Sequence, residues 1–175
     1  MERAEDKTIL VVDDEPNIRQ YLKMVLEDAG FNVVTAGDGV EALDIIKGKR
    51  PDFISLDLIM PRKSGHKLLY ELKKDKQLSR IPVLIVTAHA QDDLGKGDLE
   101  DIMENLVMSG PSVYLEKPVN PLTYVRAIQR ALGIEETEEL EDKISLKEQL
   151  QQSIQAASPE ALRKALETLK ESGKG

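Results

Sequence analysis

Cysteine is absent from the chain, and histidine occurs only twice, at His66 and His89. Without cysteine the protein can form no disulfide bond, no thiolate nucleophile and no thiolate-ligated metal site. Two histidines are too few for a histidine-rich zinc site. A metal ion would therefore have to be bound by oxygen atoms, which points to magnesium, calcium or manganese.

Aromatic residues make up only 3% of the chain, and the formal net charge is -8. Nucleic-acid binding needs clustered lysines and arginines, and unpaired bases also need aromatic side chains on which to stack. We therefore expect no nucleic-acid partner. Proteins or small anions are the expected partners.

Long apolar runs are absent as well. None approaches the ~20 residues that a membrane-spanning helix needs. The charged segment 1–8 lacks the apolar core and the cleavage site of a secretory signal. We therefore expect a cytoplasmic protein with no membrane partner.

Strand-like and helix-like segments alternate over most of the chain. Five short apolar runs predict strands, at residues 9–12, 31–36, 53–58, 82–87 and 113–116. Apolar residues recur at helical spacing between these runs, and a further helix over residues 121–132 is predicted by Asn120 as N-cap, Pro121 in the first turn and Gly133 as stop. This alternation predicts an α/β fold, a doubly wound five-stranded parallel sheet.

Two stretches do not fit a minimal five-unit domain. Residues 91–110 begin with acidic residues and glycines and then become helix-compatible. The tail, residues 134–175, opens with glutamates and predicts two short helices joined near Ala157, the second starting at Ser158-Pro159. Its acidic balance makes it a poor DNA-binding module. It either packs on its own domain or offers a surface for a partner or for a homodimer.

Polar residues stand at the carboxyl ends of four predicted strands. Asp13 and Asp14 follow the first strand, Asp57 ends the third, Thr87 ends the fourth and Lys117 follows the fifth. In an open parallel sheet, ligands bind at this edge. Three carboxylates meeting there need a cation to offset their repulsion, and Mg²⁺ prefers carboxylates, waters and phosphate oxygens. The set therefore predicts a carboxylate nucleophile, a metal site and two groups for phosphoryl oxygens.

At this point the sequence resembles a known family, the receiver domain of bacterial two-component response regulators with its CheY-like, flavodoxin-like fold. The resemblance covers residues 7–133, with 134–175 as an acidic helical extension. It rests on four groups of residues in order: Val11-Val12-Asp13-Asp14-Glu15, Asp57-Leu58-Ile59-Met60-Pro61 with Gly65, Val86-Thr87-Ala88, and Tyr114-Leu115-Glu116-Lys117-Pro118. Each group is weakly specific alone, whereas all four at predicted strand ends are very specific.

The resemblance implies that Asp57 accepts a phosphoryl group from a phosphohistidine on a sensor histidine kinase or phosphotransfer protein. It implies that Asp14 binds Mg²⁺ directly, that Asp13 binds it largely through water, and that the backbone carbonyl of Ile59 completes the protein ligands together with Asp57. Mn²⁺ is a substitute for Mg²⁺. Lys117 would pair with phosphoryl oxygens, and the peptide bond before Pro118 is commonly cis.

Further roles implied by the resemblance concern switching and phosphate lifetime. Thr87 would move to bond the phosphoryl group, and the rotamer of Tyr114 would follow it. Ile59 and His89 would set the dephosphorylation rate. Such a protein catalyses its own phosphorylation and dephosphorylation but is not an enzyme for other substrates. Simpler readings are a half-buried strand tyrosine for Tyr114 and a surface histidine for His89.

Two alternatives to a phosphorylated regulator follow from the same residues. One is a receiver-shaped interaction module that is never phosphorylated, although the acid pair, Thr87 and Lys117 argue against it. The other is a phosphatase of the haloacid-dehalogenase type with an aspartate nucleophile. Those enzymes need Asp-x-Asp, whereas here the first strand is followed by Asp-Asp-Glu and the residue two beyond Asp57 is Ile59.

Overall fold

Five parallel strands form the sheet at the centre of this computed structural model, in the order β2-β1-β3-β4-β5. The structure describes residues 2–60, 65–87, 114–135 and 138–172. The strands are β1 (Thr8–Val12), β2 (Asn32–Ala36), β3 (Phe53–Leu56), β4 (Val83–Thr87) and β5 (Tyr114–Glu116). Every neighbouring pair is parallel. The predicted α/β class with a five-stranded parallel sheet is confirmed.

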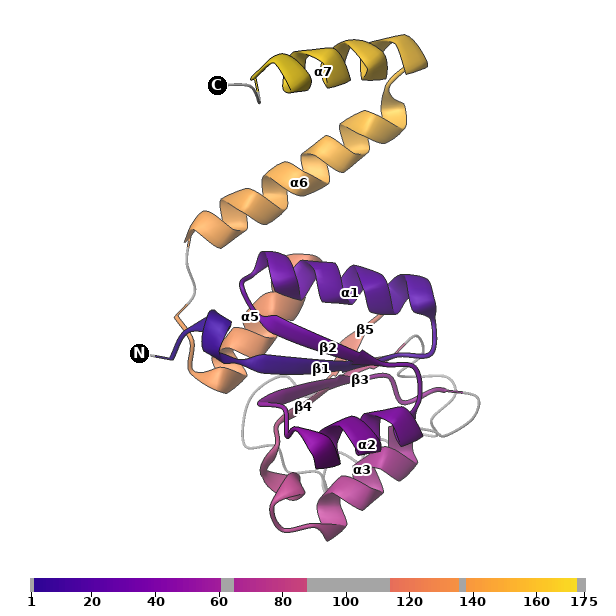
Figure 1. Ribbon diagram of the computed structural model, residues 1–175, viewed down its shortest axis with the longest axis vertical. Coiled ribbons are helices and arrows are strands. Elements are labelled where there is room, and N and C mark those ends of the chain that lie inside the picture. Colours follow the sequence, from indigo (N-terminus) through magenta and orange to yellow (C-terminus); the bar gives the residue numbers. More distant parts are fainter. Residues whose placement is uncertain (1, 61–64, 88–113, 136–137, 173–175) are drawn as a thin grey trace. The chain divides into compact units, whose positions relative to one another are not determined.

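Helices cover both faces of the sheet, as Figure 1 shows, with α1 and α5 on one face and α2 and α3 on the other. They are α1 (Pro16–Asp28), α2 (Gly39–Gly48), α3 (Gly65–Lys74) and α5 (Pro121–Leu132), and two 3-10 turns lie at Ala4–Asp6 (η1) and Leu78–Arg80 (η2). Because both faces are covered, the central strand β3 is buried along its whole length. This explains its nearly continuous apolar sequence.

Helix ends follow local chemistry. Pro16 occupies the first turn of α1, and the Asn120 side chain accepts a hydrogen bond from the backbone N–H of Thr123 at 3.0 Å. Gly133 ends α5 in the left-handed conformation, with φ of 67°. The Asp38 side chain accepts from the N–H groups of Val40 and Glu41 and so caps α2.

The third strand is shorter than predicted. It was expected to run to Leu58, but it ends at Leu56, so that Asp57 follows the strand instead of ending it. The cause is local, because the Asp57 carboxylate accepts a hydrogen bond from the N–H of Ile59 at 2.9 Å and so stabilises a turn. Leu58 and Met60 still point into the core. The core on this side is a cluster shared by the sheet, α2 and α3.

The chain forms two compact units, Met1–Glu136 and Thr137–Gly175, each with contacts mainly among its own residues. The second unit contains α6 (Glu138–Ala156) and α7 (Pro159–Ser172). Two helices were predicted here, and the first is longer than expected, at 19 residues. Several apolar side chains of this unit are exposed: Leu146, Leu150, Ile154 and Leu166.

The predicted helical stretch within residues 91–110 lies outside the described residues. Among the helices that the structure describes, none combines the length and apolar character needed to cross a membrane.

Candidate functional site

The site lies where β1 and β3 end beside each other. In the parallel register Val12 is opposite Leu56, and the N–H of Asp57 donates to the carbonyl of Val12 at 2.9 Å. The N–H of Asp13 donates in turn to the carbonyl of Ala36 at the end of β2, at 3.1 Å. The hydrogen bonds between the strands therefore continue one residue beyond β1 and β3, and they fix the backbone of Asp13 and of Asp57.

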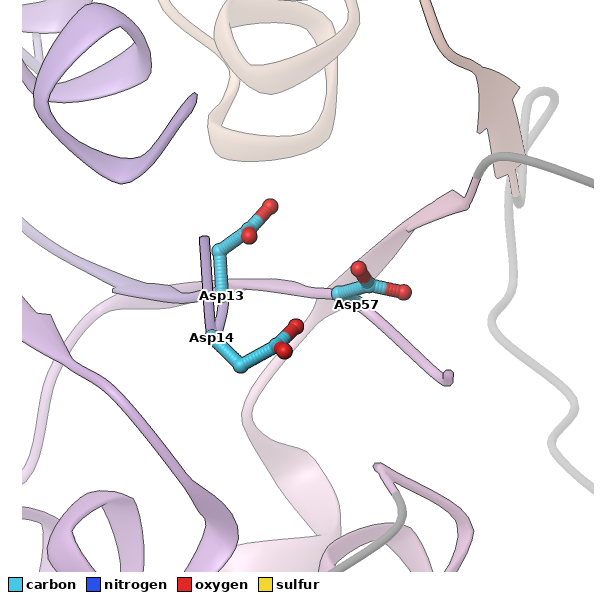
Figure 2. Close-up of side chains that lie close together, drawn as sticks. All are labelled: Asp13, Asp14 and Asp57. Atoms are coloured by element: carbon cyan, nitrogen blue, oxygen red, sulfur yellow. The ribbon is translucent and has the colours of Figure 1, made fainter. Parts of the chain in front are cut away.

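Three carboxylates gather at this edge. One ligand oxygen from each of Asp13, Asp14 and Asp57 lies within 4.8 Å of the others. Figure 2 shows the side chain of Asp14 directed toward the space beside Asp57. Asp13 and Asp57 are only 1% and 4% exposed, whereas Asp14 is half-buried. Such a cluster of negative charge cannot stay ionised inside a protein without a nearby cation.

Lys117 supplies one positive charge from the end of the edge strand β5. It follows β5, and its Nζ lies 2.8 Å from Oδ2 of Asp57 and 2.8 Å from Oδ2 of Asp13. A longer contact of 3.5 Å reaches Glu15 at the rim. The lysine side chain is 8% exposed, so that its ammonium is held between the two buried acids. The peptide bond between Lys117 and Pro118 is cis, as the resemblance implied.

Burial and charge act in opposite directions on these groups. Burial disfavours the Lys117 ammonium, but the hydrogen bonds and charges of Asp13 and Asp57 outweigh it and raise the pKa of Lys117 above its ordinary 10.5. Burial raises the pKa of Asp13 above its ordinary 3.8, although Lys117 and the N–H of Glu15 act against this rise. A divalent cation beside these carboxylates would lower the pKa of Asp13 again.

The donor set fits a hard divalent cation. Lys117 neutralises one of the three negative charges of Asp13, Asp14 and Asp57, so two remain for a cation. Oδ1 of Asp13 accepts from the N–H of Glu15 at 2.9 Å, and Oδ2 of Asp57 accepts from Lys117. Within the described residues no hydrogen bond reaches the Asp14 carboxylate, which leaves its oxygens available as ligands.

The structure describes the remaining predicted residues, Ile59, Thr87, Tyr114 and His89, in different detail. Ile59 is 40% exposed beside Asp57, and its N–H is bonded to that carboxylate. Thr87 ends β4 opposite Glu116, and Tyr114 begins β5 opposite Ile85. Thr87 therefore ends the fourth strand as predicted, and Tyr114 lies within the predicted fifth strand. The structure describes only the backbone of these two residues. His89 lies outside the described residues.

Two contacts were not found by reading the sequence. The first belongs to Gly65, where α3 begins: a Cβ atom there would lie 2.3 Å from the carbonyl oxygen of Asp57 and 2.8 Å from Cα of Leu58. The first residue of α3 thus lies in close contact with the backbone of Asp57 and Leu58. The second belongs to Arg19 in the first turn of α1, whose Nη1 donates to the carbonyl of Asp13 at 2.6 Å. Helical side chains lean toward the N-terminus, so the position of Arg19 one turn beyond the acid pair was a usable signal.

A family model described as the response regulator receiver domain matches residues 9–129. Among curated proteins, the polar-differentiation response regulator DivK of Brucella anthropi is 32% identical over 127 residues, which cover 73% of this chain and 97% of DivK. The probable transcriptional regulatory protein TcrX of Mycobacterium tuberculosis is 34% identical over 139 residues, 77% of this chain and 55% of TcrX. The chain thus spans nearly all of one relative and about half of the other.

Solved structures show the same likeness. The chemotaxis protein CheY4 of Vibrio cholerae superposes with a TM-score of 0.61 at 32% identity, covering 71% of this chain and 98% of CheY4. A response regulator receiver domain protein from Clostridium thermocellum gives a TM-score of 0.59 at 33% identity, covering 73% and 94% of the two chains.

Proposed function

Because this chain belongs to the response regulator receiver domain family, we propose that it is a phosphorylation-switched signalling protein of a two-component system, with Asp57 as the phosphoacceptor. The observation that carries this proposal is the contact of Lys117 with Asp57 at 2.8 Å inside a cluster of three carboxylates. Asp57 is thereby a buried carboxylate with a cation already beside it, where new negative charge will arrive.

The proposed reaction is a direct transfer. A carboxylate oxygen of Asp57 attacks the phosphorus of a phosphohistidine, an O–P bond forms, the P–N bond breaks, and the imidazole leaves with the electron pair. The Ile59 N–H holds the other aspartate oxygen through its 2.9 Å hydrogen bond. This bond orients the nucleophile, and orientation supplies much of what phosphoryl transfer requires.

Asp13, Asp14, Asp57 and the carbonyl of Ile59 are the residues that we assign to a Mg²⁺ ion, for which Mn²⁺ can substitute. When bound, the ion offsets the charge of the transferred phosphoryl group. Asp14 is the direct ligand, because within the described residues it accepts no hydrogen bond. Oδ1 of Asp13 already accepts a hydrogen bond from the Glu15 N–H, and its Oδ2 forms an ion pair with Lys117, which suits binding through water.

Lys117 and Thr87 bind phosphoryl oxygens in this proposal, and Tyr114 is coupled to Thr87 as a switch. Ile59 sits beside Asp57 with 40% exposure, where its side chain limits the approach of water. In this proposal Ile59 sets the lifetime of the aspartyl phosphate together with His89, whose role follows from the family alone. The protein promotes its own phosphorylation and dephosphorylation without turning over other substrates.

We propose a sensor histidine kinase or phosphotransfer protein as the donor and a protein as the output partner. Residues 7–133 act as the receiver and residues 134–175 as an acidic helical extension without DNA-binding function, in keeping with the net charge of -8. A homodimer through the extension and a cytoplasmic location stay predictions.

The test is chemical labelling of Asp57. Incubation with acetyl phosphate and Mg²⁺ should add one acid-labile phosphate to the parent protein and none to Asp57→Asn, and a chelator should abolish labelling. Asp44→Asn is a matched control, since it removes an exposed aspartate from α2. Equal labelling of the parent and Asp57→Asn would contradict the proposal.

Two other outcomes would replace the proposal with a different function. A folded parent protein that neither labels nor responds to beryllofluoride with Mg²⁺ would be an unphosphorylated interaction module. Sustained turnover of small phosphate esters would indicate a phosphatase.

A further inference from the structure

Arg19 holds the backbone next to the metal-binding acids. Its Nη1 donates to the carbonyl oxygen of Asp13 at 2.6 Å. The N–H of the same residue, Asp13, donates to Ala36 at 3.1 Å, and its Oδ1 accepts from the N–H of Glu15 at 2.9 Å. The backbone of Asp13 is therefore held on the sheet side by β2 and on the helix side by Arg19.

The bond from Arg19 acts on Asp14 through the shared peptide. The carbonyl of Asp13 and the N–H of Asp14 belong to one planar group. Cα of Asp14 lies in the same plane. A hydrogen bond that fixes the direction of the Asp13 carbonyl therefore also restrains the atom from which the Asp14 side chain starts. Within the described residues no hydrogen bond reaches the half-buried Asp14 carboxylate itself, so the backbone before it carries more of its positioning.

We propose that Arg19 is a positioning residue for the metal site: through the Asp13 carbonyl it holds the Asp14 carboxylate where Mg²⁺ is bound. The inference rests on the proposed function, in which Asp14 is the direct ligand. Partners that orient metal ligands without touching the metal commonly change affinity when they are removed. Arg19 suits this role because its planar guanidinium keeps a fixed donor geometry.

The sign of the effect separates positioning from simple electrostatics. Arg19 carries a positive charge, and a positive charge near the site repels a divalent cation. If charge alone mattered, removing Arg19 would strengthen Mg²⁺ binding. If Arg19 positions Asp14, removing it weakens Mg²⁺ binding despite the lost repulsion.

The experiment measures the Mg²⁺ dissociation constant by isothermal titration calorimetry for the parent, Arg19→Met and Arg19→Lys. We expect the constant to rise roughly tenfold in Arg19→Met and to rise less in Arg19→Lys, which keeps one donor. Lys23→Met is the matched control: Lys23 lies one turn further along α1 and pairs only with Glu27 among the described contacts, at 3.7 Å. It loses the same charge and should bind Mg²⁺ as the parent does.

Phosphorylation by acetyl phosphate provides a second readout. Arg19→Met should label slowly at low Mg²⁺ and approach the parent rate when Mg²⁺ saturates, since Asp57 and Lys117 are untouched. A dissociation constant equal to or below that of the parent would overturn the role of Arg19, as would a defect that saturating Mg²⁺ does not repair. Failure of the parent itself to bind Mg²⁺ would instead overturn the proposed function. If Arg19→Met does not fold, Arg19→Lys decides by the same criterion.

Discussion

Lys117 is the residue on which the charge balance of the site depends. Its ammonium contacts the two buried acids Asp13 and Asp57 at 2.8 Å each. Replacing it with methionine keeps the length of the side chain but leaves both carboxylates without their cation. We expect Lys117→Met to lower the free energy of unfolding by about 3 kcal/mol in the absence of divalent ions, because an unpaired buried charge is costly.

Urea titration with and without Mg²⁺ measures this change. Mg²⁺ should stabilise Lys117→Met more than it stabilises the parent, since the ion then supplies the missing positive charge. Lys23→Met controls for the loss of a surface lysine, and its unfolding free energy should differ from that of the parent by less than about 0.5 kcal/mol. Equal stability of Lys117→Met and the parent would show that the contacts to Lys117 contribute nothing.

The pKa of Lys117 predicts how stability depends on alkaline pH. Its pKa is raised in the folded protein above its ordinary 10.5, so the folded state binds the proton more tightly than the unfolded state does. This contribution is complete below pH 10.5 and is lost as the pH rises through the folded pKa. Burial also raises the pKa of Tyr124, so this residue lowers stability in the same pH range in both proteins.

The parent should therefore lose unfolding free energy above about pH 10.5 more steeply than Lys117→Met does. Urea titrations between pH 9 and 12 measure this difference, and parallel curves for the two proteins would contradict the assignment.

At the scale of the secondary-structure elements, the start of α3 is tied to the phosphoacceptor. The N–H of Gly65 donates to the carbonyl of Leu58 at 3.0 Å, and a Cβ on Gly65 would lie 2.3 Å from the carbonyl oxygen of Asp57. The two atoms nearest to such a Cβ, the carbonyl oxygen of Asp57 and Cα of Leu58, belong to the backbone and cannot rotate away. Gly65→Ala should therefore destabilise the protein by about 2 kcal/mol, as overpacking does, and it should slow labelling of Asp57.

Gly48→Ala is the matched control for that substitution. Gly48 is the last residue of α2, and a Cβ there meets nothing within 4 Å. Alanine should stabilise the helix end by about 0.5 to 1 kcal/mol. Urea midpoints of the two variants measure the contrast. If Gly65→Ala were as stable as Gly48→Ala, α3 would not bear on the Asp57 backbone.

Element type and order were predictable from local pattern. Short apolar runs located the strands, and Asn120, Pro121 and Gly133 marked the two ends of α5 by their own chemistry. The exact end of β3 was not predictable. It depends on whether the Asp57 carboxylate turns back to the N–H of Ile59, which an apolar run cannot reveal.

The composition of the site was also predictable, because carboxyl ends of parallel strands share one edge. Its distances were not. Lys117 lies 60 residues from Asp57 along the chain, and only the completed sheet determines that its ammonium contacts two acids. The same applies to the contacts of Arg19 and Gly65. The sequence shows Arg19 near the start of the first helix and Gly65 in the motif after Asp57, but it does not show which backbone atoms they meet.

At the scale of the whole molecule, the chain carries a net charge of -8, and the described part of it buries two aspartates beside a third. Binding of Mg²⁺ to the folded state alone must stabilise that state by mass action. At a Mg²⁺ concentration 100 times the dissociation constant, the free energy of unfolding should rise by about 2.7 kcal/mol. Sodium chloride at matched ionic strength should not reproduce this rise, since it screens surface charge without entering a carboxylate cluster.

Asp14→Asn identifies the source of the stabilisation. It removes the carboxylate that we assign as the direct ligand and also one of three mutually repelling charges. In the absence of Mg²⁺ it should therefore be at least as stable as the parent, because repulsion inside the cluster falls. In its presence the gain of about 2.7 kcal/mol should largely disappear. Undiminished stabilisation by Mg²⁺ in Asp14→Asn would mean that the ion acts elsewhere on this acidic chain, and that the cluster at the strand ends is not its binding site.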